Sequence, residues 1–153
     1  MQERPEIHDA IAALGRLADV FALRRRLLAR EAGLSLAQWR LLEEIAGEAF
    51  MPSLFARRRD CTPAAVSRGL RALQERGLVT AAVGANDARQ RVYRLTPAGR
   101  RLLAKLRRGR ARAISAVWEG FDPQALRGFV AFADELADHL ERYAAGGPGP
   151  RSR

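Results

Sequence analysis

The chain has 153 residues, and its 27 Lys and Arg against 17 Asp and Glu give a formal net charge of +10, which favours a polyanion as partner over a basic surface that only confers solubility. A single Cys excludes an intramolecular disulfide, and no apolar run approaches the roughly 18 residues of a membrane span. The N-terminus lacks the basic-then-apolar order of a secretion signal, so we expect one cytoplasmic globular domain.

Helical spacing dominates the first third of the chain. A helix over roughly 6–30 is predicted by apolar residues that recur at three, four or seven positions: Ile7, Ile11, Leu14, Ala18, Phe21 and Leu28. Gly33 closes this helix, and Ser35 can cap the next one, predicted over 36–49. Pro52 then begins a short helix that we place at 52–60.

The following helix has both a start and a stop signal. Thr62 can cap it, Pro63 takes the first position, where the missing N–H costs nothing, and Gly77 is placed to end it. Segments 78–83 and 89–95 are short and rich in β-branched residues, and the turn residues between them predict a hairpin.

The remainder of the chain has a helical pattern. Thr96 with Pro97, and Asp122 with Pro123, repeat the cap-and-proline start, which predicts long helices over about 97–119 and 123–143. The composition of residues 146–153 is typical of a flexible tail. We therefore expect a mainly α fold with a small β-hairpin wing, in a single domain over 1–145.

The helix after Thr62 has two opposite faces. Val66, Leu70 and Leu73 fall within about 60° of one another and form a core face. The other face is small, then polar, then basic, and comprises Ala64, Ser67, Arg68 and Arg71. A short helix, a sharp turn, this helix and a hairpin make a winged helix-turn-helix, whose second helix fits the major groove with its N-terminal residues nearest the base edges.

Charge is segregated along the chain in a way that supports a nucleic-acid partner. From Arg57 to Arg112 there are sixteen Lys and Arg against three Asp and Glu, whereas from Ala113 to Tyr143 there are two Arg against six acids. A charge that only confers solubility need not segregate like this, but a nucleic-acid footprint does.

Three motifs in the same region form a family pattern when taken together. They are a recognition helix ending in Leu-x-x-x-Gly-Leu-Val, a wing with Asp-x-Arg, and Leu-Thr-x-x-Gly-Arg at the start of the next helix. Here they are Leu73 with Gly77-Leu78-Val79, Asp87 with Arg89, and Leu95-Thr96 with Gly99-Arg100. With these motifs, and with the segment around Trp39, the stretch from about 33 to 106 resembles the MarR family of winged-helix transcriptional regulators.

The resemblance implies a homodimer in which the N- and C-terminal helices, here 6–30 and 100–143, interlock. The two winged regions, here 35–96, then meet successive major grooves of a palindromic operator in double-stranded DNA. Family members are mostly repressors, and many release DNA when a small aromatic acid or a related phenolic binds between the two regions. We expect a regulator of this kind.

The resemblance also implies which residues contact DNA. Those on the recognition helix are Thr62, Ala64, Ser67, Arg68 and Arg71. In the wing, Arg89 would enter the minor groove, with Asp87 as its orienting partner and Arg91 as support. The sequence departs from the family at Arg59, which replaces an apolar residue, and at Asp60-Cys61, which replaces Gly plus an aliphatic, so the register of 52–61 is open.

Dimerisation has support of its own in the last helix. A second apolar stripe there comprises Leu126, Phe129, Val130, Ala133, Leu136, Leu140 and Tyr143. Two long helices with wide apolar faces at opposite chain ends have little within one small domain to cover them, and each buried Leu or Phe contributes roughly 1.5–3 kcal/mol. An intrachain helical pair is the alternative to a twofold dimer.

Two smaller sites each have two readings. Cys61, beside Arg57, Arg58 and Arg59, is a candidate oxidation sensor, or else a small apolar residue packed in the core. Arg16, Trp39 and Arg40 are candidates for an effector pocket, because a guanidinium over an indole suits an aromatic carboxylate. In the alternative reading, Trp39 belongs to the core and the two arginines lie on the surface.

Catalysis is not expected, because there is no Gly-rich phosphate loop, no Cys/His cluster and no convincing nucleophile with its base. His8 and His139 are too few for a metal site, and no cofactor is expected. The function that we expect is therefore sequence-specific DNA binding. The alternatives are a non-specific architectural or RNA-binding basic protein, and a thiol-based redox-sensing regulator that uses Cys61.

Overall fold

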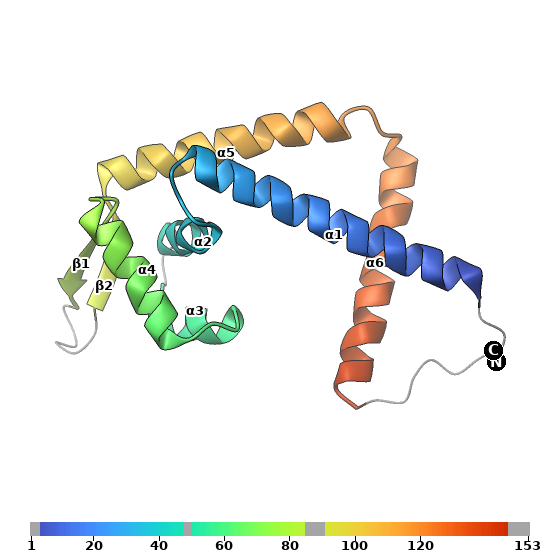
Figure 1. Cartoon of the computed structure of the whole chain (residues 1–153), viewed down its shortest axis with the longest axis horizontal. Coiled ribbons are helices and arrows are strands. Elements are labelled where there is room, and N and C mark those ends of the chain that lie inside the picture. Colours follow the sequence, from blue (N-terminus) through green and yellow to red (C-terminus); the bar gives the residue numbers. More distant parts are fainter. Residues whose placement is uncertain (1–3, 48–49, 85–90, 147–153) are drawn as a thin grey trace. The chain divides into compact units, whose positions relative to one another are not determined.

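The computed structural model describes residues 4–47, 50–84 and 91–146 of the chain. It contains the helices α1 (Pro5–Glu31), α2 (Leu36–Ile45), α3 (Pro52–Arg58), α4 (Pro63–Glu75), α5 (Pro97–Trp118) and α6 (Pro123–Ala144). Strands β1 (Val79–Val83) and β2 (Arg91–Leu95) form an antiparallel hairpin between α4 and α5 (Figure 1). The mainly α fold with a hairpin wing is thereby confirmed.

The chain divides into two compact units, Met1–Ala111 and Arg112–Arg153, with the boundary inside α5. The first unit holds the hairpin and the hydrophobic core. The second holds the end of α5 and all of α6, and the rings of Trp118 and Phe121 lie there with their centroids 6.1 Å apart. The single domain expected over 1–145 stays a prediction. None of the helices in the described part of the chain is both long and apolar enough to cross a membrane.

The helices begin where the capping residues stand. The Ser35 hydroxyl accepts a hydrogen bond from the Gln38 backbone, whose side chain bonds back to the Ser35 backbone in a capping box. Thr62 Oγ1 accepts from the backbone of Ala65 at 3.1 Å, and a proline occupies the first turn of α4. Asp122 caps α6 in the same way. These local hydrogen bonds explain why the predicted starts agree with the observed ones.

Two helices end earlier than predicted. The second helix was expected to reach residue 49, but α2 ends at Ile45, and the backbone of Gly47 turns back to bond the Glu44 carbonyl. The short helix was expected to reach residue 60, but α3 ends at Arg58 because Asp60 adopts a left-handed conformation with φ of 47°. Both ends are set by the turn that follows, which helical periodicity does not reveal.

The core is formed by residues of α2, α3, α4 and α5, with Ala29 of α1 and the base of the wing. Its residues are almost all aliphatic, and the least exposed large side chains are Leu41, Leu42, Leu73 and Leu106. The predicted core face of α4 is confirmed, because Val66, Leu70 and Leu73 are all buried. Since these three residues lie on one side of α4, its other side has to face solvent.

The wing is joined to the helices on both sides at its base. Val79 pairs with Leu95 in the ladder, and the backbone of Thr96 donates to the carbonyl of Leu78 at 3.0 Å. The Thr96 hydroxyl donates to the carbonyl of Gly77 at 2.6 Å and accepts from the backbone of Gly99 at 3.0 Å. Thr96 thus connects the end of α4 to the first turn of α5 and fixes where the hairpin leaves the core.

Two glycines lie where helices approach other parts of the core closely. A Cβ on Gly99 would overlap the backbone oxygen of Leu78, and a Cβ on Gly69 would lie 2.6 Å from Leu41 Cδ1. The first obstacle is backbone, whereas the second is the end of a side chain that can shift in part.

We therefore expect Gly69→Ala to lower the free energy of unfolding by about 1–3 kcal/mol, and Gly99→Ala to lower it further, because overpacking against backbone cannot relax by rotation of a side chain. Gly128→Ala is the control, since it lies inside α6 with nothing within 4 Å and should stabilise by up to about 1 kcal/mol. Urea denaturation of the three variants measures this order. Equal losses in Gly69→Ala and Gly99→Ala would contradict the close approach at Leu78.

Candidate nucleic-acid interface

The exposed face of α4 carries the residues predicted to contact DNA. The structure leaves all five of them exposed: Thr62, Ala64, Ser67, Arg68 and Arg71. Within the described part of the chain, no hydrogen bond or ion pair involves the guanidinium of Arg68 or of Arg71. Their donors therefore have no acceptor among the described residues. The small side chain of Ala64, near the start of the helix, lets the backbone approach a surface closely.

Of the three wing residues predicted to contact DNA, the structure describes only Arg91. Arg91 is exposed at the start of β2, opposite Val83. Asp87 and Arg89 lie outside the described residues, so their roles stay predictions. Sequence reasoning did not select Arg94, which is exposed on β2 opposite Thr80, where the Thr80 hydroxyl donates to the Arg94 carbonyl at 3.5 Å.

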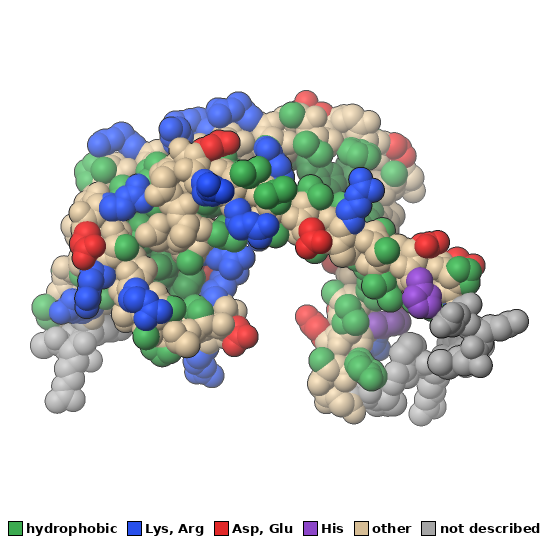
Figure 2. Space-filling view, viewed as in Figure 1, with side chains coloured by type: hydrophobic (Ala, Val, Ile, Leu, Met, Phe, Trp, Pro, Cys, Tyr) green, Lys and Arg blue, Asp and Glu red, His purple; other side chains and the backbone are tan. Residues whose placement is uncertain are grey.

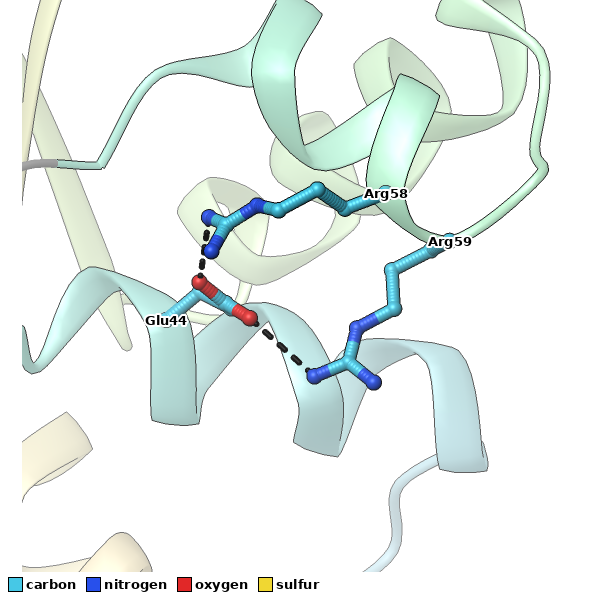
Figure 3. A network of polar contacts seen from close by, with 3 residues as sticks. All are labelled: Glu44, Arg58 and Arg59. Atoms are coloured by element: carbon cyan, nitrogen blue, oxygen red, sulfur yellow. Dashed lines mark hydrogen bonds and ion pairs between the residues drawn. The ribbon is translucent and has the colours of Figure 1, made fainter. Parts of the chain in front are cut away.

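The end of α3 is held to α2 by a carboxylate between two arginines (Figure 3). Arg58 Nη2 donates to Glu44 Oε2 and Arg59 Nη2 donates to Glu44 Oε1, both at 3.1 Å. The Glu44 side chain is 20% exposed, while those of Arg58 and Arg59 are 52% and 46% exposed. Arg59, in place of an apolar residue, thus anchors the helix end through charge. Sequence reasoning did not select Glu44, because its partners lie 14 and 15 residues further along the chain.

The turn between α3 and α4 contains Asp60 and Cys61. The backbone of Cys61 donates to the carbonyl of Ala56 at 3.0 Å, and the half-buried Cys61 packs against the core cluster. An open cleft of about 300 Å³ lies beside the turn, lined by residues of α2, α3 and α4 together with Cys61. This placement suits a small apolar residue at position 61, and the redox role stays a prediction.

The three candidate effector residues differ in how far they are buried. Trp39 is 7% exposed, and its indole N–H donates to Glu43 Oε1 at 3.2 Å. Arg107 of α5 donates to the other carboxylate oxygen of Glu43 at 2.7 Å. Trp39 is therefore a core residue, and its indole helps to orient the Glu43 carboxylate that connects α2 to α5. Arg16 and Arg40 are exposed, and the effector role of all three residues stays a prediction.

Lys and Arg side chains gather over α4 and along the first half of α5, as Figure 2 shows. The acidic residues Asp134, Glu135, Asp138 and Glu141 are all on α6. Among the described residues, no group of three or more His, Cys, Asp and Glu side chains could hold a metal ion. The arrangement on α4 and α5 can bind a polyanion through forked and point-charge contacts.

Comparison with known proteins shows a similarity in sequence over part of the chain and in fold over most of it. Residues 32–90 match a family model described as MarR family. A search of curated protein sequences gives no significant match. The solved structure of a MarR family transcription regulator superposes with a TM-score of 0.83 at 19% identity, covering 92% of this chain and 94% of that one.

Two further solved structures show relatives with partners bound. Staphylococcus aureus MarR in complex with salicylate and kanamycin is similar with a TM-score of 0.76 at 17% identity, covering 91% of this chain and 95% of that one. A variant of S. aureus MepR bound to an oligodeoxyribonucleotide is similar with a TM-score of 0.61 at 15% identity, covering 86% of this chain and 97% of that one. At these identities the likeness establishes a shared fold.

The link through Glu43 makes stability depend on pH. Burial by itself would raise the pKa of Glu43, but hydrogen bonds from Arg107 and Trp39 and the positive charges of Arg107 and Arg110 outweigh it, so the pKa is lowered from the ordinary value of 4.5. A carboxyl with a lowered pKa stabilises the fold above its unfolded-state value, and this stabilisation is lost as the pH falls through the folded-state value.

We expect the free energy of unfolding of the wild type to fall below about pH 4.5 more steeply than that of Glu43→Gln, and to exceed it near neutrality by about 1 kcal/mol or less, since the pair with Arg107 is partly exposed. Urea titrations at several pH values measure this difference. Glu75→Gln, an exposed position on α4, should run parallel to the wild type. Parallel curves for the wild type and Glu43→Gln would show that the link has no such effect.

Proposed function

We propose that this chain is a MarR family regulator, because residues 32–90 match that family's model and the fold is that of a MarR family transcription regulator. In this proposal it is a cytoplasmic, dimeric repressor that binds a specific DNA operator and is released by a small aromatic acid or phenolic. The proposal rests on one observation above all. The face of α4 opposite its core residues is exposed and carries two arginines with no partner among the described residues. The role is binding rather than catalysis.

The geometry of α4 suits the major groove. Its N-terminal end is capped by Thr62, and the exposed residues Ala64 and Ser67 are small enough for the helix to lie close to base edges. Arg68 lies about one helical turn after Ala64, and Arg71 about two turns after it. A free guanidinium can donate two hydrogen bonds to O6 and N7 of a guanine, or bind phosphate, so these two side chains are the ones that we propose to read or anchor the operator.

Dimerisation is proposed because each of the two terminal helices has large apolar side chains that are exposed among the described residues. On α1, Ile11 is 62% exposed, and on α6, Leu140 is 60% exposed. None of the residues of α6 is buried. A continuous apolar face of this kind on a soluble protein marks an interaction site. A second copy supplies the same two faces, and its twofold symmetry matches a palindromic operator with half-sites about one DNA turn apart.

The effector is proposed to be a small aromatic acid, whose carboxylate suits the exposed Arg16 of α1 and Arg40 of α2. The S. aureus relative was solved in complex with salicylate, which is such an acid. Arg16 and Arg40 remain our candidates for its carboxylate, because a planar guanidinium binds a carboxylate in a forked arrangement. With its indole N–H bonded to Glu43, Trp39 would contribute its ring and not a hydrogen bond.

Specific DNA binding is tested by enriching duplexes from a random library with the wild-type protein. The enriched site should bind at least about a thousandfold more tightly than random DNA of the same length. Arg68→Ala and Arg71→Ala should each lose about 1–3 kcal/mol of affinity for that site, measured by titration at fixed salt. Arg24→Ala removes an equal charge from an exposed position on α1 and should leave the affinity unchanged.

An absence of enrichment, with tight binding to any duplex or to RNA, would overturn the proposal in favour of a non-specific architectural or RNA-binding protein. Release of DNA by peroxide that Cys61→Ser abolishes would instead identify a thiol-based regulator.

The dimer is tested by sedimentation equilibrium of the wild type and of a variant with Val130→Asp and Leu140→Asp. Both substitutions place charge on the exposed apolar face of α6. Because each apolar side chain contributes roughly 1.5–3 kcal/mol on burial and occurs twice in a twofold dimer, the dimer dissociation constant should rise by at least about a hundredfold. Glu135→Gln, an exposed polar position on the same helix, is the control. A monomeric wild type at micromolar concentration would rule the dimer out.

A further inference from the structure

The first half of α5 carries a basic stripe, which we define as Arg101, Lys105 and Arg108. These residues are spaced by four and three positions, so they fall within about 60° of one another on the helix. All three are exposed. Leu103 and Leu106, on the other side of α5, are each 2% exposed and pack into the core. The basic stripe therefore faces away from the core.

Nothing within the described part of the chain compensates the charge of the basic stripe. No hydrogen bond or ion pair among the described residues involves its three side chains, and no Asp or Glu occurs in α5. Two neighbouring cations do have partners, since Arg107 donates to Glu43 and Arg100 donates to the carbonyl of Leu95. Like charges at this spacing repel each other by a few tenths of a kcal/mol per pair, and a bound polyanion would remove that repulsion.

The basic stripe is separate from the recognition face of α4. Both helices turn their apolar residues towards the same hydrophobic cluster, so their exposed faces point away from it in different directions. Figure 2 shows one group of Lys and Arg side chains along α5 and another around α4. A duplex read by α4 therefore leaves the stripe free for another stretch of nucleic acid.

We propose that the basic stripe is a second DNA-binding surface, which holds the phosphate backbone of a duplex without reading its sequence. The proposal rests on the DNA-binding function proposed above. From Pro97 to Ala111, every exposed position of α5 other than these two end residues carries a cation, and none carries a large apolar side chain. A protein partner needs an apolar centre in its interface, whereas a phosphate backbone needs only cations.

The length of the basic stripe fits this partner. Arg101 and Arg108 are seven residues apart, which is about 10 Å along the helix axis. One strand of duplex DNA presents about three phosphates over that distance. The backbone can belong to the flanks of the operator duplex or to a second duplex, and the chemistry of contact is the same in both cases.

The test compares the wild type with a variant that combines Arg101→Gln, Lys105→Gln and Arg108→Gln. The matched control combines Arg4→Gln, Arg26→Gln and Arg30→Gln, which removes three exposed cations from α1 and its N-cap. Each protein is titrated with the enriched site alone, with the same site carrying long random flanks, and with a second labelled duplex offered to protein already saturated with the short site. Thermal unfolding shows that all three proteins are folded.

The variant should bind the short site like the wild type. At low salt, the variant should bind at least one of the other two probes about tenfold or more weakly than the wild type does. On that probe, the slope of log affinity against log salt should fall by about three per protomer. The control should match the wild type on all probes. If the variant loses affinity for the flanked site alone, the stripe contacts the phosphate backbone of the operator's own flanks. If it loses affinity for the second duplex, the stripe contacts the backbone of another DNA molecule. Either result supports the proposal.

Unchanged binding of both the flanked site and the second duplex by the variant would overturn the proposal. Loss of binding to polyglutamate with both DNA probes retained would also overturn it, and would identify an acidic protein as the partner. If the wild type enriches no site yet binds random duplex with a salt slope that depends on the stripe, the operator proposal fails while the second surface stands.

Discussion

The arrangement of this protein depends on a shared apolar cluster, to which α2, α4 and α5 each present one side. Because Val66, Leu70 and Leu73 fill that cluster from α4, the opposite side of the helix cannot be buried in this chain. The same constraint acts on α5 through Leu103 and Leu106. An amphipathic helix on a small core therefore fixes both what is buried and which cations are presented outwards.

Two adjacent carboxylates on α2 add polar links to this apolar packing. Glu43 bonds Arg107 of α5 and the indole of Trp39, whereas Glu44 bonds Arg58 and Arg59 at the end of α3. The helix α2 is thus connected to α5 through Glu43 and to the end of α3, just before α4, through Glu44. Each exposed ion pair contributes only modestly to stability, so the value of these links lies in orientation.

The motifs anticipated the fold closely where the signal was local. Caps, prolines and periodic apolar residues gave the starts of α2, α4 and α6, the core face of α4 and the hairpin, because these features depend on hydrogen bonds within four residues and on helical geometry. Contacts between residues far apart in the sequence were not predicted. The pairing of Glu44 with Arg58 and Arg59, and that of Glu43 with Arg107, could not be anticipated, because nothing in the sequence specifies which cations a carboxylate reaches.

The sequence by itself determined the order of elements, the charge segregation and the small-then-basic face of α4 from which DNA contact is predicted, since each is a property of neighbouring residues or of composition. Only the tertiary structure decided that Trp39 is buried and bonded to Glu43, that Asp60 ends α3 with a left-handed turn, and that Arg101, Lys105 and Arg108 remain without partners among the described residues. Burial and pairing depend on what the chain brings together from distant positions, and that is settled by packing.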